Sequence, residues 1–139
     1  MILVDTGFWL ALANRRDTHH AAAVARLAEI DEPLVTTWPV LTETCHLLLR
    51  RLGPDSQTAF LDSLAAGAFE VFPLEPHHAP RLRVLMHTYR DLPMDLADAS
   101  LVVAAEVLEE GRILSTDRRD FGAYRWKGRE VFENVFRSP

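Results

Sequence analysis

Cysteine and long apolar runs are scarce in this chain of 139 residues. The single cysteine, Cys45, excludes an internal disulfide, and its place in the apolar stretch TETCHLLL predicts a small buried hydrophobic residue. Such cysteine usage is typical of the reducing cytoplasm. The N-terminus MILVDTGFW has no basic region and meets a carboxylate at Asp5, and no other apolar run is long enough to span a bilayer. The sequence therefore predicts neither a signal peptide nor a membrane span.

A surplus of positive charge is also missing, since the formal net charge is −5 at pH 7. This argues against a broad basic surface that attracts nucleic acid regardless of its sequence. All of the 15 basic residues except Lys127 are arginine. Arginine can bind phosphate through two parallel hydrogen bonds, although a GC-rich coding sequence would explain the same bias. Any phosphate-rich substrate is therefore expected to be held locally.

Several well-known catalytic motifs are absent. The 6 histidines do not show the spacing of a zinc hydrolase. There is no phosphate-binding P-loop and no Gly-x-Ser-x-Gly motif, and Cys45 lies among leucines, a poor place for a nucleophile. Asp5 as a covalent phosphoryl acceptor would need a nearby lysine, and the only one is Lys127 in a late loop. These absences direct attention to the carboxylates.

Strand-like and helix-like apolar segments alternate along the chain. We predict strands at 2–4, 34–36, 69–72, 113–115 and 130–132, and helices at 8–13, 19–30, 39–52, 54–67, 76–89 and 96–110. This order predicts an α/β fold of three layers, with a central, mostly parallel sheet of four to five strands flanked by helices. A single domain over 1–139 is expected, because about 68–70% of the unfolded surface can be buried at this length. No repeat or linker is visible, apart from a loosely patterned tail after Asn134.

Four acidic residues that are distant in sequence lie where predicted elements begin or end: Asp5, Glu43, Asp98 and Asp117. In parallel sheets, ligands bind beyond the carboxyl ends of the strands, and Asp5 and Asp117 each follow a strand. Every position also has a structural explanation, as a helix cap, a first-turn acid or a turn residue, and Asp95 is the natural cap of the helix that contains Asp98. Their joint arrangement favours a site where a divalent cation neutralises their repulsion.

Such a site would suit hydrolysis of a phosphodiester. Carboxylate oxygens are typical ligands of Mg²⁺ or Mn²⁺, and a bound cation activates water and stabilises charge on the phosphate. Thr6 and Thr116 are next to two of the acids, where their hydroxyls could hold waters or a phosphate oxygen. Four arginines are candidates for contact with the flanking backbone of a nucleic acid: Arg15, Arg16, Arg118 and Arg119.

Four segments, in this order, resemble the PIN-domain ribonucleases and, more narrowly, the small VapC toxins of bacterial toxin–antitoxin pairs. They are the strand that ends in Asp5-Thr6, TTWPVLTE with Glu43, LADASLVVAAE with Asp98, and ILSTDRRDF with Asp117. The resemblance extends from residue 2 to about residue 125. It implies a PIN-like fold and a metal-dependent endoribonuclease that serves as the toxin of such a pair.

The resemblance also implies roles for individual residues and for partners. Asp5 and Asp98 would contact Mg²⁺ or Mn²⁺, and Glu43 and Asp117 would complete the acidic pocket. Asp95 leaves open which of two neighbouring carboxylates touches the metal, and the family pattern favours Asp98, which directly precedes the apolar helix. An RNA substrate, a homodimer and an inhibitory antitoxin protein are implied as well. Two alternatives stay open: a catalytically silent PIN-like module that binds RNA or protein, and a hydrolase of small acyl or phosphoryl esters.

Overall fold

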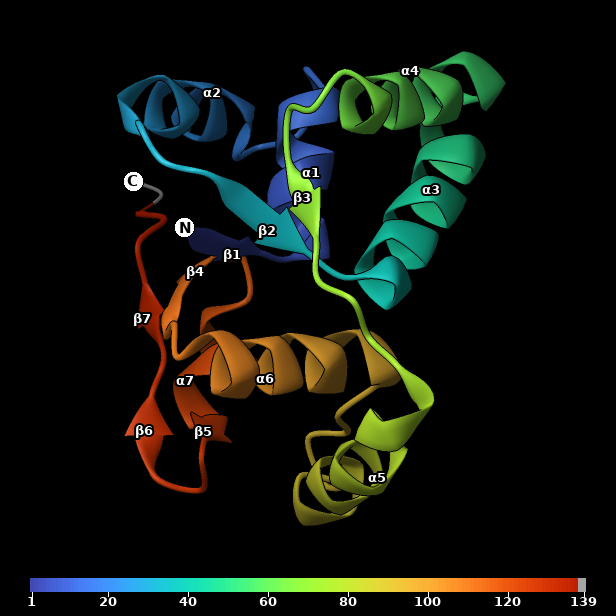
Figure 1. The fold of residues 1–139 in the computed structure, drawn as a ribbon. Helices are drawn as coiled ribbons and strands as arrows, with labels where there is room; N and C mark the ends of the chain where they lie inside the picture. The colour runs from blue at the N-terminus through green and yellow to red at the C-terminus, as the bar shows by residue number, and fades with distance from the viewer. Residues whose placement is uncertain (138–139) are drawn as a thin grey trace.

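The structure is a computed structural model that describes residues 1–137 and is built around a parallel sheet (Figure 1). The strands of this sheet are β1 (Ile2–Val4), β2 (Leu34–Thr36), β3 (Glu70–Val71), β4 (Arg112–Leu114) and β7 (Glu133–Asn134). They lie in the order β3-β2-β1-β4-β7, and every neighbouring pair is parallel. The predicted α/β fold is thereby confirmed.

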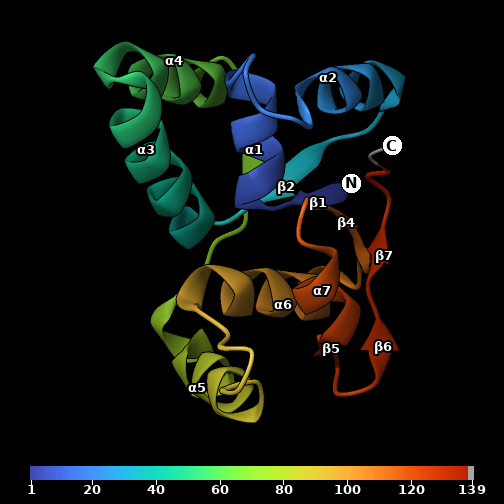
Figure 2. The same ribbon diagram turned by 180° about the vertical axis from the view of Figure 1, so that it is seen from behind.

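Seven α-helices cover the sheet within the described residues. They are α1 (Thr6–Ala13), α2 (His20–Glu29), α3 (Trp38–Leu52), α4 (Pro54–Ala65), α5 (Ala79–Thr88), α6 (Leu96–Leu108) and α7 (Arg118–Ala123), with a 3₁₀ turn, η1, at Pro76–His78. Figures 1 and 2 show α1, α2 and α4 above the sheet, α5, α6 and α7 below it, and α3 along one side. No helix within residues 1–137 is both long and apolar enough to cross a membrane.

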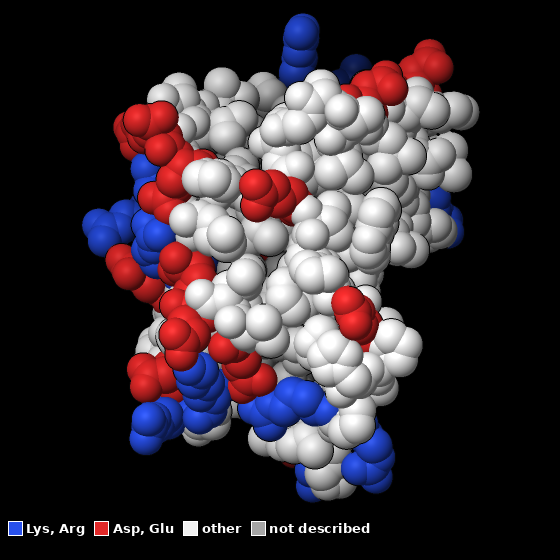
Figure 3. All heavy atoms as spheres, in the orientation of Figure 1, with Lys and Arg blue, Asp and Glu red and all other residues white. Residues whose placement is uncertain are grey.

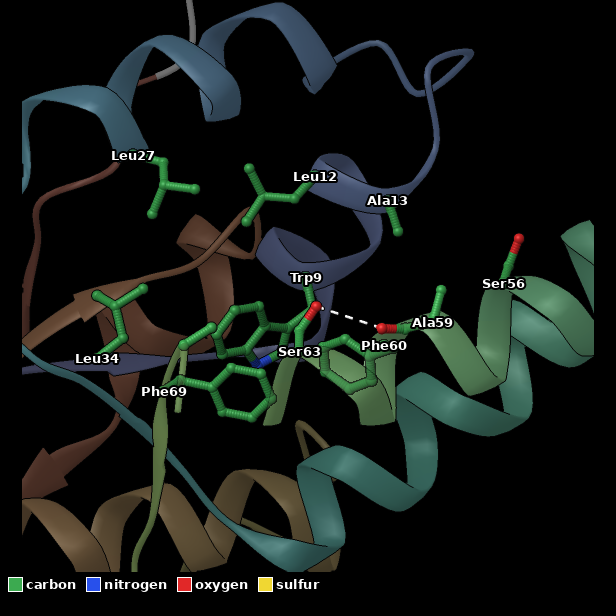
Figure 4. A pocket seen from close by; sticks show the side chains of 11 residues that line it. Trp9, Leu12, Ala13, Leu27, Leu34, Ser56, Ala59, Phe60, Ser63 and Phe69 are labelled. Carbon is green, nitrogen blue, oxygen red and sulfur yellow. Dashed lines mark hydrogen bonds between the residues drawn. The ribbon is translucent and has the colours of Figure 1, made fainter. Parts of the chain in front are cut away.

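The buried hydrophobic residues form one continuous core around β1 and β4. All of Ile2–Val4 is buried, because helices cover both faces of the strand. Most of α6 is buried as well. The rings of Trp9, Phe60 and Phe69 pack with centroids 4.5–5.5 Å apart. Together with Leu12 and Leu27 they line an apolar cavity of about 360 Å³ between α1, α2 and α4 (Figure 4).

Two features near the C-terminus differ from the prediction. The segment expected as a fifth strand at 130–132 does not join the main sheet, because its residues in β6 (Glu130–Val131) pair antiparallel with β5 (Arg125–Trp126). The fifth strand of the main sheet is β7 instead, which pairs with β4. The helix α7 was also not predicted, since its sequence RRDFGA follows directly on an aspartate and resembles a turn.

Candidate active site

The centre of the sheet brings two acidic segments together. Asp5 follows β1 and Asp117 follows β4 after a short loop, and β1 and β4 are neighbours. The strands that follow β1 in the sequence, β2 and β3, lie on one side of it in the sheet, and β4 and β7 lie on the other side. The carboxyl ends of β1 and β4 therefore form the switch point where ligands bind in open α/β sheets.

Asp5 is almost completely buried at this switch point, with 7% of its surface exposed. It caps α1: its Oδ1 accepts a hydrogen bond from the backbone amide of Thr6 at 2.8 Å. Its Oδ2 accepts one from Ser115 Oγ at 3.0 Å. Burial raises the pKa of Asp5 to about 6, since it outweighs these two bonds, and the charges of Glu43 and Asp117 add to the rise. Two hydrogen bonds thus hold the Asp5 carboxyl in place, while its burial disfavours the ionised form.

The start of α6 contributes a second pair of carboxyls. Asp95 is the N-cap, and its Oδ1 accepts a hydrogen bond from the backbone amide of Asp98 at 2.9 Å. Asp98 Oδ2 accepts a 2.7 Å hydrogen bond from the hydroxyl of Tyr124. Burial raises the pKa of Asp98 to about 7 despite this bond, and the charges of Asp95, Asp5 and Asp120 act in the same direction.

Glu43 comes from the second turn of α3 and is half-buried. Burial raises its pKa, and the charge of Asp95 raises it further. A buried hydrogen bond of 2.6 Å between Thr37 Oγ1, at the N-cap of α3, and Ser100 Oγ on α6 ties these two helices together. That bond joins the N-terminus of α3 to α6 two residues after Asp98.

Asp117 caps α7, as its Oδ1 accepts a 3.0 Å hydrogen bond from the backbone amide of Asp120. Its own backbone amide donates to Ser115 Oγ at 2.9 Å. Burial and the neighbouring Asp117 raise the pKa of Asp120. The capping explanations considered from the sequence for Asp5 and Asp95 are therefore correct, and Asp117, considered there as a turn residue, caps α7. The same side chains also lie at one acidic site.

Of the two threonines expected to support the site, Thr6 is buried next to Asp5 and Thr116 is half-buried next to Asp117. Thr6 Oγ1 is buried without a hydrogen-bond partner of good geometry among the described residues, yet it is close enough to Glu43 to lower the pKa of that carboxyl. A Cβ atom built on Gly7 would lie 2.0 Å from Thr116 Oγ1. The start of α1 and the loop after β4 thus approach so closely that a side chain at position 7 would have to displace the Thr116 hydroxyl.

The four arginines proposed to contact RNA divide into two pairs. Arg118 and Arg119 are exposed at the first two positions of α7, directly after Asp117, and Arg119 Nε lies 3.7 Å from an oxygen of Asp120. Arg15 and Arg16 are exposed in the turn after α1. That helix is about 12 Å long at 1.5 Å per residue, so the structure does not bring this pair to the acidic site.

Six carboxyl groups are close enough for the charge of one to raise the pKa of another: Asp5, Glu43, Asp95, Asp98, Asp117 and Asp120. No three acidic, histidine or cysteine side chains within residues 1–137 already form a metal-coordinating group. Mg²⁺ does not require one, because it usually keeps several waters and takes only one or two protein carboxylates directly. The oxygen donors and the unpartnered hydroxyl of Thr6 fit a hydrated divalent cation.

Three site residues carry no charge and were missed in the sequence. Ser115 bonds to Asp5, and Tyr124 bonds to Asp98. Asn134 on β7 holds the backbone of Ser115, since its Oδ1 accepts from the Ser115 amide at 3.3 Å and its Nδ2 donates to the Ser115 carbonyl at 2.9 Å. For Ser115, its position directly after a buried strand could have served as a signal; Tyr124 and Asn134 offer none.

Residues 2–127 of this chain match the family described as PIN domain. The chain belongs to the PIN-domain family. The resemblance to PIN-domain proteins stated from the sequence is thus confirmed.

The relatives of known name are VapC proteins. The chain is 31% identical over 124 residues to "Ribonuclease VapC26" of Mycobacterium tuberculosis, covering 89% of this chain and 92% of that protein. It is 45% identical over 53 residues to "23S rRNA-specific endonuclease VapC20" of the same species, a match to 38% of this chain and 40% of the relative. The crystal structure of M. tuberculosis VapC20, described as a sarcin–ricin loop cleaving toxin, superposes with a TM-score of 0.80 at 23% identity over 86% of this chain and 92% of that chain. The last likeness supports the fold.

Proposed function

We propose that the protein is an endoribonuclease that requires Mg²⁺ or Mn²⁺ and acts as the toxin of a toxin–antitoxin pair. The observation that carries the proposal is the convergence of acids from β1, α3, α6 and the loop after β4 at one switch point of the sheet. The near full-length likeness to a protein named as a ribonuclease supports the same reading.

Asp5 and Asp98 would hold the cation, and Glu43 and Asp117 would complete the pocket. Both proposed ligands have a raised pKa. Burial disfavours the ionised form of each carboxyl, and a bound cation would favour that form again. When bound, the cation would lower the pKa of water and stabilise charge that develops on the phosphate.

The other side chains would position the reacting groups. Ser115 and the Thr6 amide hold the two oxygens of Asp5. Glu43 and Asp117 are acceptors that can orient a water for attack on phosphorus, and the unpartnered Thr6 hydroxyl can donate to a water or to a phosphate oxygen. As the water oxygen bonds to phosphorus, the water would pass a proton to one of these carboxylates. The bond between phosphorus and the leaving oxygen breaks, and the leaving oxygen takes up a proton from solvent.

RNA would be bound by local contacts. Figure 3 shows charged side chains of both signs gathered along the edge formed by α2 and β5–β7, and a largely uncharged surface over α3 and α4, with no extended basic face in this view. Arg118 and Arg119, next to the acids, are suited to the phosphates that flank the cleaved bond. Arg15 and Arg16 would contact RNA only at a distance from that bond.

We also propose a homodimer and a cytoplasmic location, in which an antitoxin protein restrains the enzyme. Sedimentation at micromolar concentration tests the dimer. Expression of the chain alone should arrest growth, and co-expression of the small open reading frame beside its gene should relieve the arrest. Unaffected growth with confirmed folded protein would argue against the toxin role and leave the nuclease chemistry to be tested separately.

Cleavage of RNA by the purified protein is the decisive experiment. Activity should require Mg²⁺ or Mn²⁺, stop with EDTA, and fall by at least about 1,000-fold in Asp5→Ala plus Asp98→Ala, because the cation would lose both direct ligands. Asp55→Ala plus Asp62→Ala is a matched control, since these acids are exposed on α4. Full activity of the first double variant would contradict the proposal. Metal-independent RNA binding without cleavage would favour the silent binding module.

A further inference from the structure

Tyr124 is a buried aromatic residue that bonds to the acidic site. Its surface is 0% exposed, and its hydroxyl donates a 2.7 Å hydrogen bond to Asp98 Oδ2. The bond joins the residue that ends α7 to the first turn of α6. A tyrosine hydroxyl this deep in the core needs a partner, and here the partner is a carboxylate of the site.

The position of this hydroxyl is fixed by packing. The Tyr124 ring meets Tyr89 and Phe121 edge to face, with ring centroids 5.1 Å away in both cases. Its backbone amide donates to the Asp120 carbonyl at 2.9 Å, which closes α7. A ring held on two sides and anchored through its backbone cannot follow Asp98 if that carboxylate turns.

We propose that Tyr124 is a positioning residue for Asp98. By binding Oδ2 it fixes the plane of the carboxylate and leaves Oδ1, which makes no bond to Tyr124, as the oxygen that meets the cation. The inference rests on the proposed function, because it assigns Asp98 to a metal. The six-residue helix α7 has Asp117 as its N-cap and Tyr124 as its C-cap. This one helix would therefore position two acids, Asp117 directly and Asp98 through Tyr124.

A purely structural role would make a different prediction. If the bond only joined α7 to α6, its loss would lower the melting temperature and leave metal affinity unchanged. If it positions Asp98, its loss would weaken metal binding and turnover in a protein that is still folded. Groups that hold metal ligands in place typically change metal affinity or activity by about 10–100-fold when they are removed.

Tyr89→Phe is a matched control for Tyr124→Phe. Both residues lie in the same aromatic cluster, but the Tyr89 hydroxyl accepts a hydrogen bond from the backbone amide of Arg125 at 2.9 Å and makes no bond to Asp98. Each substitution removes one hydrogen-bonded hydroxyl and keeps the ring. The two variants should therefore lose comparable stability and differ only in what happens at Asp98.

The experiment measures Mn²⁺ affinity by electron paramagnetic resonance without RNA, and kcat and KM with RNA. We expect Tyr124→Phe to weaken Mn²⁺ binding and kcat by about 10-fold or more with KM within about 2-fold, and Tyr89→Phe to change neither. In an Asp98→Asn background, Tyr124→Phe should add no further loss of Mn²⁺ affinity, because its effect passes through Asp98.

Four results would overturn the proposal. Unchanged Mn²⁺ affinity in folded Tyr124→Phe, or equal losses in the two tyrosine variants, would leave Tyr124 a structural residue while the nuclease function stands. A further loss in the Asp98→Asn background would show that Tyr124 acts by another route. Absence of both Mn²⁺ binding and RNA cleavage in the unaltered protein would overturn the proposed function together with this inference.

Discussion

The carboxyls of Asp5 and Asp98 are held where burial opposes their ionisation, with pKa values of about 6 and about 7. A carboxyl whose pKa is raised on folding adds stability below its unfolded pKa, and this contribution is lost as the pH rises through the folded pKa. Without metal, both contributions are therefore present near pH 4 and are lost between about pH 4 and 8. For Asp5 the rise from 3.8 to about 6 corresponds to about 3 kcal/mol.

Asp98→Asn should therefore stabilise the metal-free protein at pH 8. Asparagine keeps an acceptor for Tyr124 and removes the charge, while the lost interaction with the helix dipole costs about 0.3–1 kcal/mol. We expect a net gain of about 1 kcal/mol in EDTA at pH 8 and a smaller difference at pH 5, measured by urea unfolding. Mg²⁺ should reverse the order by stabilising only the unaltered protein. A less stable variant at pH 8 would show that the first-turn position of Asp98 matters more than its burial.

Charge decides which site residues are visible in the sequence. Asp5 and Asp98 stand out because carboxylates rarely occur within apolar segments without a reason. Tyr124 does not, because a tyrosine near a helix end is an ordinary core residue, and Ser115 offers only its position after a buried strand. The role of Tyr124 follows from a contact with a residue 26 positions away in the sequence, and that of Ser115 from a contact 110 positions away. Only the fold determines such contacts.

At the scale of elements, the contact between the start of α1 and the loop after β4 holds the site together. A Cβ atom on Gly7 would lie 2.0 Å from Oγ1 and 3.2 Å from Cβ of Thr116. Rotation of the threonine would relieve the first contact and not the second. The glycine is thus favoured by a close approach, since no left-handed backbone conformation is involved at this position.

Gly7→Ala should lower the free energy of unfolding by about 1–3 kcal/mol, the usual cost of overpacking. Thr116→Ala removes the atom in the way, so the double variant should recover part of the loss, and the two changes should be non-additive. Denaturant unfolding of the four proteins measures this coupling. Additive effects would mean that the loop moves aside without strain and that the approach does not constrain the site.

Elements were predictable where their patterns are long enough. The strands at Ile2–Val4 and Leu34–Thr36 have the predicted bounds, because continuous apolar runs there are flanked by clear breaks. At the C-terminus the pattern is too short: β7 has two residues, and the chain first turns back at Lys127 and Gly128, both with positive φ, to form β5–β6. Which short segment joins β4 is decided by tertiary packing, including Phe136, buried against Phe8 at a ring distance of 5.2 Å.

At the scale of the whole molecule, the distribution of charge constrains how RNA could bind. The net charge is −5, and the one face of the molecule that Figure 3 shows carries no extended basic patch. Affinity for RNA that depends on phosphate contacts comes from release of counterions and falls with salt in proportion to the number of contacts. A protein with few local arginines and an acidic site should therefore bind RNA with a shallow salt dependence.

We expect a slope of log K against log salt of about −1.4 for single-stranded RNA, if Arg118 and Arg119 supply the phosphate contacts at about −0.7 each. Binding to Asp98→Asn protein in Mg²⁺, where cleavage is suppressed, gives the measurement. Arg118→Ala plus Arg119→Ala should flatten the slope nearly to zero. Arg15→Ala plus Arg16→Ala is the control pair, because these arginines lie in the turn after α1. A flatter slope in this double variant would mean that the bound RNA extends along α1 to that turn. A slope steeper than about −5 would require many more phosphate contacts than one acidic edge provides, as in a groove shared between two copies of the chain.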